Sequence, residues 1–198
     1  MKVLVIPEDF RKDQFILKPV ITALLGSLNV PNPKVRVCQD PLLGGIGQAL
    51  REDRIREIVE RYPMIDLFLL CVDRDGQPGR KIQLDRLESS MNRHLSPGKT
   101  LFAENAWQEI EVWILAGMND LPAAWSWNAI RDEPDSKEIY FQRYAQDRGL
   151  GNEPGEGRKS LAESAAARIQ RIVTLCPEDV GNLKSRIADW IHSHRTGP

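Results

Sequence analysis

Three acidic side chains follow the two most strand-like segments of this chain. Asp73 and Asp75 come directly after the apolar run 65–72, which only Asp66 interrupts, and Glu8 follows the apolar run 3–6. Residues i and i+2 of an extended chain point the same way, so Asp73 and Asp75 can face one ion. The carboxyl ends of parallel strands lie at one edge of a sheet, and hard oxygen ligands favour Mg²⁺, Mn²⁺ or Ca²⁺ over zinc. These residues therefore predict a divalent-metal site.

An ordinary solvated turn is the alternative for the Asp pair, because Asp and Gly are common turn residues. Glu8 at a second strand end favours the metal site instead. The segment 74–99 contains six basic and three acidic residues, so cations flank the proposed site. Lys and Arg neutralise phosphates while metal ions act on the reacting one, and the arrangement therefore suits a phosphodiester substrate.

Composition sets wider limits. A chain of 198 residues with 41% hydrophobic content can bury a full core, and its net charge of −1 argues against a protein that coats polyanions in general. Cys38, Cys71 and Cys176 are odd in number and far apart, which is typical of reduced thiols in a cytoplasmic protein. The sequence shows neither a signal peptide nor an apolar stretch long enough for a bilayer, so we expect no membrane contact.

The first half of the chain alternates between strand and helix patterns. Continuous apolar or β-branched runs predict strands at 2–6, 34–38, 65–72 and 100–103, and apolar residues at helical spacing predict helices at 15–28, 46–61 and 82–95. Pro19 must lie early in the first helix or kink it. Alternating elements of this kind imply an α/β fold whose parallel sheet carries helices on both faces.

The second half is predicted to be helical. Apolar residues at helical spacing indicate helices at 107–115, 160–175 and 179–191, and the glycine-rich segment 149–157 is typical of a mobile loop. We therefore expect an α/β core over residues 1–105 and a helical extension, packed on that core, over residues 106–198.

The order of these motifs resembles the TOPRIM domain of topoisomerases, primases and OLD-type nucleases. In that family a glutamate follows the first strand, a helix comes next, and a DxDG motif ends a later buried strand, as Glu8 and 73–76 do here. The segments 109–116 (EIEVWILA) and 157–159 (GRK) are similar to a small bacterial group of TOPRIM proteins related to the OLD nucleases. One departure is that Asp9 follows the glutamate, which in the family usually lies beside a glycine.

The resemblance implies a role for each matching residue. Glu8 would be the acid/base or metal-binding glutamate, and Asp73 and Asp75 would bind Mg²⁺ or Mn²⁺. Glu111, or in its place Glu109, would complete a second metal site, and Lys159 would offset charge in the transition state.

Simpler interpretations exist for the last three residues. Glu109 and Glu111 are two apart on a predicted helix and cannot share a face, so at least one should be solvated, and Glu111 is our choice of ligand. Lys159 could equally be an ordinary residue in the first turn of a helix, beside a flexible loop and without a catalytic role.

Three functions are open at this point. The first is a metal-dependent nuclease or related phosphoryl-transfer enzyme that acts on DNA or RNA; the resemblance adds genome defence alongside a separate ATPase, because this chain has no ATPase motif. The second is a receiver-like phosphoacceptor, although no Lys-Pro follows the fourth strand. The third is a non-catalytic module of the same fold that binds a partner through exposed tryptophans among Trp107, Trp113, Trp125 and Trp127.

Overall fold

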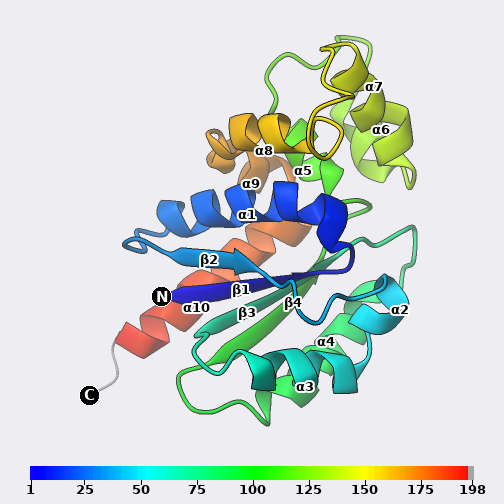
Figure 1. Cartoon of the computed structure of the whole chain (residues 1–198). Helices are drawn as coiled ribbons and strands as arrows, with labels where there is room; N and C mark the ends of the chain where they lie inside the picture. The colour runs from blue at the N-terminus through cyan, green and yellow to red at the C-terminus, as the bar shows by residue number, and fades with distance from the viewer. Residues whose placement is uncertain (196–198) are drawn as a thin grey trace.

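A four-stranded, all-parallel sheet forms the centre of the protein (Figure 1). The computed structural model describes residues 1–195. The strands are β1 (Lys2–Pro7), β2 (Lys34–Val37), β3 (Leu67–Val72) and β4 (Thr100–Asn105), in the order β2-β1-β3-β4. In the register of β1 and β3, Pro7 lies beside Cys71, so Glu8 and Asp73 leave the sheet at the same edge. The predicted α/β class with a parallel sheet is confirmed.

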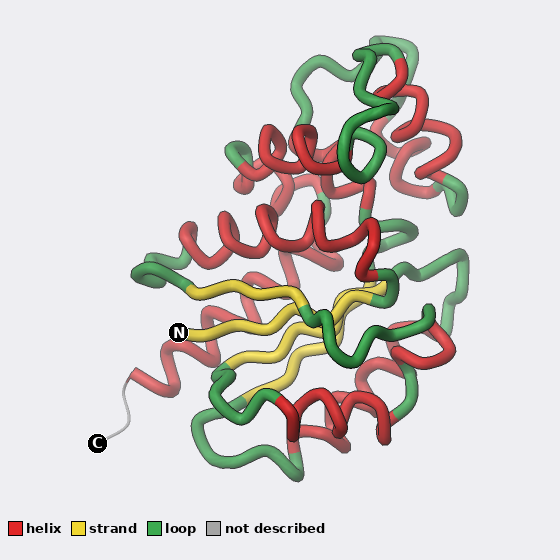
Figure 2. Tube along the Cα trace, in the orientation of Figure 1, coloured by secondary structure: helices red, strands yellow, loops and turns green. Residues whose placement is uncertain are grey.

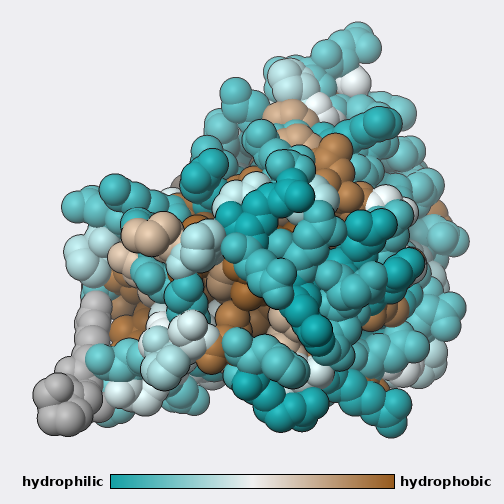
Figure 3. All heavy atoms as spheres, turned by 60° about the horizontal axis from the view of Figure 1, so that its bottom comes forward, coloured by the Kyte–Doolittle hydropathy of each residue, from teal (hydrophilic) through white to brown (hydrophobic). Residues whose placement is uncertain are grey.

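Helices cover both faces of the sheet (Figure 2). One face packs against α1 (Phe10–Ser27) and α10 (Asn182–Arg195), and the other against α3 (Glu52–Arg61) and α4 (Arg80–Asn92). Successive side chains of β1 alternate between the two cores, because Val3 and Val5 face α1 whereas Leu4 and Ile6 face α3 and α4. The outer surface on the α3 and α4 side is mostly hydrophilic (Figure 3).

Helix α1 begins five residues earlier than the apolar pattern predicts. Asp9 has an extended backbone, and its side chain accepts a hydrogen bond from the Arg11 N–H at 2.8 Å, so it caps the helix. Pro19 consequently lies in the middle of α1 and not early in it. Its missing N–H leaves one helical hydrogen bond unmade, and the apolar face from Ile16 to Leu25 holds the helix on the sheet.

Two predicted helices are each split in two. Residues 46–61 form α2 (Ile46–Ala49) and α3, and residues 160–175 fall in α8 (Arg158–Ala166) and α9 (Ile169–Leu175). The backbone leaves the helical region at Arg51 (φ −89°, ψ 121°) and at Arg168 (φ −115°, ψ 39°). Hydrophobic spacing shows which side chains share a face, so a two-residue break that keeps the same face buried is hard to detect from the spacing.

All regular elements described beyond Asn105 are helical, as predicted. They comprise α5 (Glu111–Gly117), α6 (Trp127–Asp132), η1 (Lys137–Phe141), α7 (Gln142–Gln146), α8, α9, η2 (Pro177–Gly181) and α10. Figure 1 shows α8 and α9 against the outer side of α1, with α6 and α7 farther out. One hydrophobic core joins β1, α1, α5, α8 and α10. Among the described helices, none is both long and apolar enough to cross a membrane.

The tryptophans named above are tied into the fold. Trp113 is fully buried, and its indole N–H donates to Asp179. Trp125 packs edge-on against Tyr140 at 5.1 Å between ring centroids, and the Trp127 N–H donates to a backbone carbonyl at 3.1 Å. These contacts give the rings structural roles, which weakens the case for a partner surface made of tryptophan.

Candidate active site at the carboxyl ends of the strands

Glu8 and Asp73 lie side by side where β1 and β3 end. The Asp73 N–H points to Glu8 Oε2 at 3.4 Å, and the Ile110 N–H donates to Asp73 Oδ1 at 2.8 Å. This second bond also explains why the helix predicted at 107–115 begins only at Glu111: Asp73 holds the preceding turn. The structure thus places two of the predicted site residues together.

Asp75 adjoins the same site from a more exposed position. Its backbone is left-handed (φ 51°), and its carboxylate lies 3.7 Å from Arg80 Nη2. Arg74 points elsewhere, with its guanidinium 4.4 Å from the centre of the Trp107 ring. The left-handed turn at Asp75 means that the extended chain expected over 73–75 is wrong, because strand β3 already ends at Val72. The charge of Asp75 contributes to the raised pKa of Glu8, which shows that the two carboxylates are close.

Asp13 is a member of the site that the sequence analysis missed. It lies in the first turn of α1 on the buried side, and its Oδ2 accepts the Asp9 N–H at 3.1 Å. Burial and the charge of Glu111 raise the pKa of Asp13 to about 8. A signal was available, because Asp13 shares a helix face with Ile16, Leu17 and Val20, where an acidic residue is out of place.

Glu111 comes to the site from α5 and is held by Arg158. Arg158 Nη2 and Nε donate to Glu111 Oε1 at 2.5 and 2.8 Å, and the arginine side chain is fully buried. Of the loop predicted at 149–157, residues 151–154 lie exposed at the surface, and Gly155 packs against α1. At Gly155 (φ +68°) a Cβ would lie 2.5 Å from the Phe15 ring, so only glycine lets the loop approach α1 and aim Arg158 inward.

Glu109 is bound outside this cluster. It accepts hydrogen bonds from the Lys137 N–H at 2.5 Å, from Lys137 Nζ at 2.9 Å and from Ser136 Oγ at 3.2 Å. Glu109 and Glu111 are both at most 4% exposed, so the expectation that one of them is solvated is wrong. The reason is that Glu109 precedes the helix, and each carboxylate has its own cation.

Lys159 lies on the outside of α8. Its side chain is exposed and lines a groove between α1 and α8 together with Phe15 and Lys18. The structure does not bring it to the carboxylates, and the adjacent Arg158 takes that place. Because neighbouring residues of a helix point about 100° apart, only one of the two can face the core.

We name Glu8, Asp13, Asp73, Asp75 and Glu111 the carboxylate cluster. Burial, followed by the charges of Glu111, Asp13 and Glu8, holds the pKa of Asp73 well above its usual range. Burial and the charge of Asp75 raise the pKa of Glu8 to about 7. In the described part of the chain no cationic side chain lies within 4 Å of Glu8, Asp13 or Asp73, so negative charge exceeds positive charge here.

The donors of the cluster suit a hard divalent cation. They are all carboxylate oxygens. Burial and neighbouring negative charge raise the pKa of Glu8, Asp13 and Asp73, and a cation bound among them would offset the same repulsion. Over residues 1–195, however, no three His, Cys, Asp or Glu side chains are already arranged to hold a metal ion. The cluster fits Mg²⁺ or Mn²⁺ in its chemistry, and binding would require the side chains to turn toward the ion.

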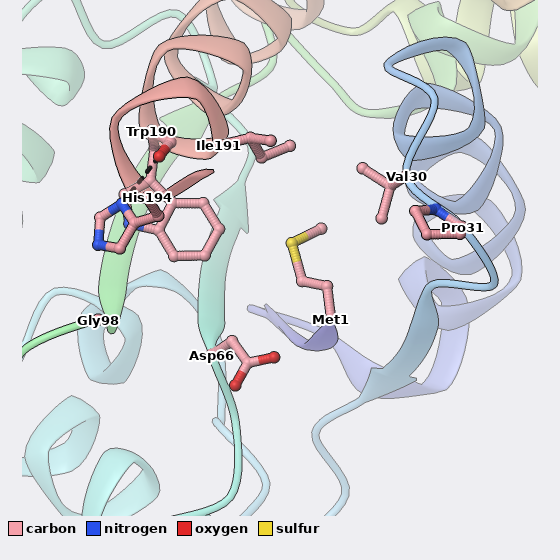
Figure 4. A pocket seen from close by; sticks show the side chains of 8 residues that line it. All are labelled: Met1, Val30, Pro31, Asp66, Gly98, Trp190, Ile191 and His194. Carbon is pink, nitrogen blue, oxygen red and sulfur yellow. Dashed lines mark hydrogen bonds between the residues drawn. The ribbon is translucent and has the colours of Figure 1, made fainter. Parts of the chain in front are cut away.

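The opposite end of the sheet offers a different kind of cavity (Figure 4). A hollow of about 310 Å³ lies between Met1, Val30 and Pro31 on one side and Trp190, Ile191 and His194 on the other. Asp66 is the one carboxylate among its lining residues, and it accepts the Lys2 N–H at 2.7 Å. A single, already hydrogen-bonded carboxylate gives this cavity no counterpart of the carboxylate cluster.

Comparisons of the chain with protein-family models, with curated proteins and with solved structures found no match. The TOPRIM resemblance therefore remains a prediction that depends on the sequence motifs alone.

Proposed function

We propose that the protein is a metal-dependent phosphodiesterase that cleaves nucleic acid, with the carboxylate cluster as its active site. The observation that carries this proposal is the meeting of Glu8, Asp13, Asp73 and Glu111 from four separate segments at one edge of the sheet. Burying several carboxylates together is unfavourable unless protons or cations offset their charge. Open α/β sheets commonly bind ligands at the carboxyl ends of their strands, which is where this cluster lies.

Glu8, Asp73 and Asp75 would hold Mg²⁺ or Mn²⁺, and Glu111 would contribute from the other side. A divalent ion in such a site lowers the pKa of a bound water and neutralises charge on a phosphoryl oxygen. Two backbone N–H groups, those of Asp73 and Ile110, fix the orientation of Glu8 and Asp73. Arg158 positions Glu111 through Oε1 alone, so Oε2 receives no bond from Arg158.

Glu8 is the residue best suited to move a proton. Burial and the charge of Asp75 raise its pKa to about 7 in the metal-free protein. If Asp73 and Asp75 hold the ion and Glu8 is not a ligand, Glu8 would take a proton from an attacking water and release it again near neutral pH. Arg80 is the cation best suited to contact substrate phosphate. It lies 3.7 Å from Asp75, it is 7% exposed, and its buried Nε has no hydrogen-bond partner among the described residues.

A cleavage assay tests the proposal. Purified protein is incubated with supercoiled DNA, single-stranded DNA and RNA in Mg²⁺, in Mn²⁺ and in EDTA. We expect cleavage of at least one substrate with metal and none in EDTA, and we expect Asp73→Asn and Asp75→Asn each to reduce the rate by about 10³-fold or more.

Glu104→Gln is the matched control. Glu104 is a buried carboxylate at the end of β4, but it is paired with Lys81 and Arg186, and we expect its neutralisation to leave the metal-dependent rate within about threefold. A rate that is equal in wild type, Asp73→Asn and Asp75→Asn would assign the activity to a contaminant and remove the proposal. So would a wild type that fails to cleave any substrate and gains no thermal stability from Mn²⁺.

The choice between DNA and RNA, and a genome-defence role beside a separate ATPase, remain predictions. The ATPase follows from the family resemblance only. Adding a candidate ATPase to the same assay would test it directly.

A further inference from the structure

A basic groove lies at the amino-terminal ends of β1 and β2, at the opposite end of the sheet from the carboxylate cluster. It encloses about 350 Å³ beside the edge strand β2. Its lining residues are Lys2, Lys34, Arg36, Arg61, Tyr62, Pro63, Met64 and Ile65. Four of these eight side chains are cationic and none is acidic, which sets the groove apart from the carboxylate cluster.

The strand register forces three of these cations together. Lys2 and Lys34 are direct partners in neighbouring parallel strands, which lie about 4.8 Å apart. Arg36 follows two residues after Lys34 and therefore points to the same face of the sheet. Like charges placed opposite one another on adjacent strands are destabilising, so an anion bound between them would relieve a repulsion built into the fold.

No carboxylate compensates these three cations. Among the described residues, Lys2, Lys34 and Arg36 form no side-chain ion pair, whereas Arg61 is neutralised by Asp40 at 2.5 Å and by Glu57 at 3.1 Å. Asp66, which follows Ile65 of the groove, accepts the backbone N–H of Lys2, and its side chain lines the cavity of Figure 4.

The remaining wall of the groove is apolar and partly aromatic. Tyr62 is half-buried, and Met64 is 68% exposed, the most exposed of the large hydrophobic residues. Positive charge beside an aromatic ring is how proteins bind single-stranded nucleic acid, since cations follow the phosphates while bases stack on rings. An unpaired base can stack on a ring in the wall of a groove, whereas the bases of a duplex are already stacked on one another.

We propose that the groove binds single-stranded nucleic acid, with backbone phosphates on Lys2, Lys34 and Arg36 and a base against Tyr62. This inference rests on the proposed function in one respect: the groove would be a second binding site for the nucleic acid that the carboxylate cluster is proposed to cleave. The six residues of β1 separate the groove from Glu8 by roughly 20 Å, so one strand of nucleic acid can reach both.

Binding is measured separately from cleavage. A fluorescein-labelled 12-nucleotide oligo-dT is titrated with protein in EDTA, and its anisotropy is followed at several salt concentrations. Three phosphate contacts predict a slope of log K against log [salt] of about −2. Lys34→Gln/Arg36→Gln should weaken binding at least tenfold at low salt and reduce the slope to about −0.7.

Arg86→Gln/Arg93→Gln is the matched control, because it removes the same charge from exposed positions of α4 and its neighbourhood. We expect this control to bind within about twofold of wild type. An abasic strand of equal length should bind several-fold more weakly than oligo-dT, and so should a duplex.

Four results would overturn the proposal: no binding by wild type, equal weakening by both double variants, unchanged binding by Lys34→Gln/Arg36→Gln, or equal affinity for the abasic strand. Wild-type binding by a protein that shows neither metal-dependent cleavage nor thermal stabilisation by Mn²⁺ would instead remove the proposed function and leave the groove proposal intact. Circular dichroism of each variant verifies that the fold is kept.

Discussion

Two groups of acids lie at the same edge of the sheet, but their surroundings differ. In the carboxylate cluster at the ends of β1 and β3, no cationic side chain of the described residues lies within 4 Å of Glu8, Asp13 or Asp73. At the end of β4, Glu104 lies 3.3 Å from both Lys81 and Arg186, and Asp179 of η2 lies 3.1 Å from Arg131. We name Glu104, Asp179 and their three cations the paired edge.

The acids of the paired edge stabilise the fold through ion pairs, whereas the acids of the carboxylate cluster have few cations to neutralise them. Asp179 also accepts hydrogen bonds from the Trp113 indole at 2.8 Å and from the Trp107 N–H at 2.9 Å, so its charge is fully used in the structure. Asp73 accepts one backbone N–H and faces three other carboxylates. Unbalanced buried charge is a common mark of functional sites, which is why the proposal rests on the cluster and not on the paired edge.

The largest effect on stability should come from the paired edge. Asp179→Ala would leave Arg131, which is 7% exposed, without its buried partner. Breaking one side of a buried ion pair costs about 3–5 kcal/mol of unfolding free energy. Urea denaturation followed by circular dichroism would measure it.

Asp73→Asn is the counterpart of that variant in the carboxylate cluster. Asparagine keeps the oxygen that accepts the Ile110 N–H but removes one repelling charge, so stability should stay within about 1 kcal/mol of wild type or rise. A loss as large as that of Asp179→Ala would show that the cluster is structural, and the comparison would fail.

A smaller effect should appear in the pH dependence of stability. The pKa of Glu8 rises from 4.5 to about 7 and that of Asp13 from 3.8 to about 8, so the folded state keeps protons that the unfolded state has released. The contribution of these two carboxyl groups to stability is then greatest below about pH 4, falls as the pH rises toward 8, and levels off above that. Without metal, we expect the Tm to be at least roughly 2–4 °C lower at pH 8 than at pH 5, the shift that about 1 kcal/mol gives at this chain length.

Adding a divalent metal ion to the Tm measurements at pH 5 and pH 8 tests whether the cation competes with protons. If a cation replaces the protons of the cluster, Mg²⁺ or Mn²⁺ should raise the Tm more at pH 8 than at pH 5, and Asp13→Asn should lessen the pH dependence. Glu104→Gln should leave the metal effect unchanged, because Glu104 belongs to the paired edge. A metal effect equal at both pH values in wild type would contradict this linkage.

Local pattern explains what could be predicted from the sequence. The strand ends at Glu8 and Asp73 were predictable because a continuous apolar run followed by an acid and a turn residue marks the edge of a buried strand. The end of β4 was not, because the strand continues through Glu104 only where Lys81 and Arg186 neutralise that carboxylate. Those partners are 23 and 82 positions away, beyond any local pattern.

Side-chain direction explains what could not be predicted. Asp13 reaches the cluster because α1 begins at Phe10, a start set by the Asp9 cap and not by apolar spacing. Arg158 and Lys159 are adjacent cations of similar type, and the sequence motif does not indicate which one faces inward. The approach of Gly155 to Phe15 decides between them.

The smallest predicted effect comes from Lys159, the exposed member of that pair of cations. Lys159 is exposed on α8, so Lys159→Ala should change the unfolding free energy by no more than about 0.5 kcal/mol and any metal-dependent rate by less than about threefold. Arg158→Ala is its natural comparison, because it leaves Glu111 buried without its cation and should lower stability by several kcal/mol, about the cost of a broken buried pair. Arg158→Lys should recover only part of this loss, since an ammonium group cannot donate through two nitrogens as Nε and Nη2 do. Rates at saturating Mn²⁺ and urea denaturation of the three variants would distinguish the roles of Arg158 and Lys159. A large loss of rate with unchanged stability in Lys159→Ala would show that Lys159 is catalytic after all.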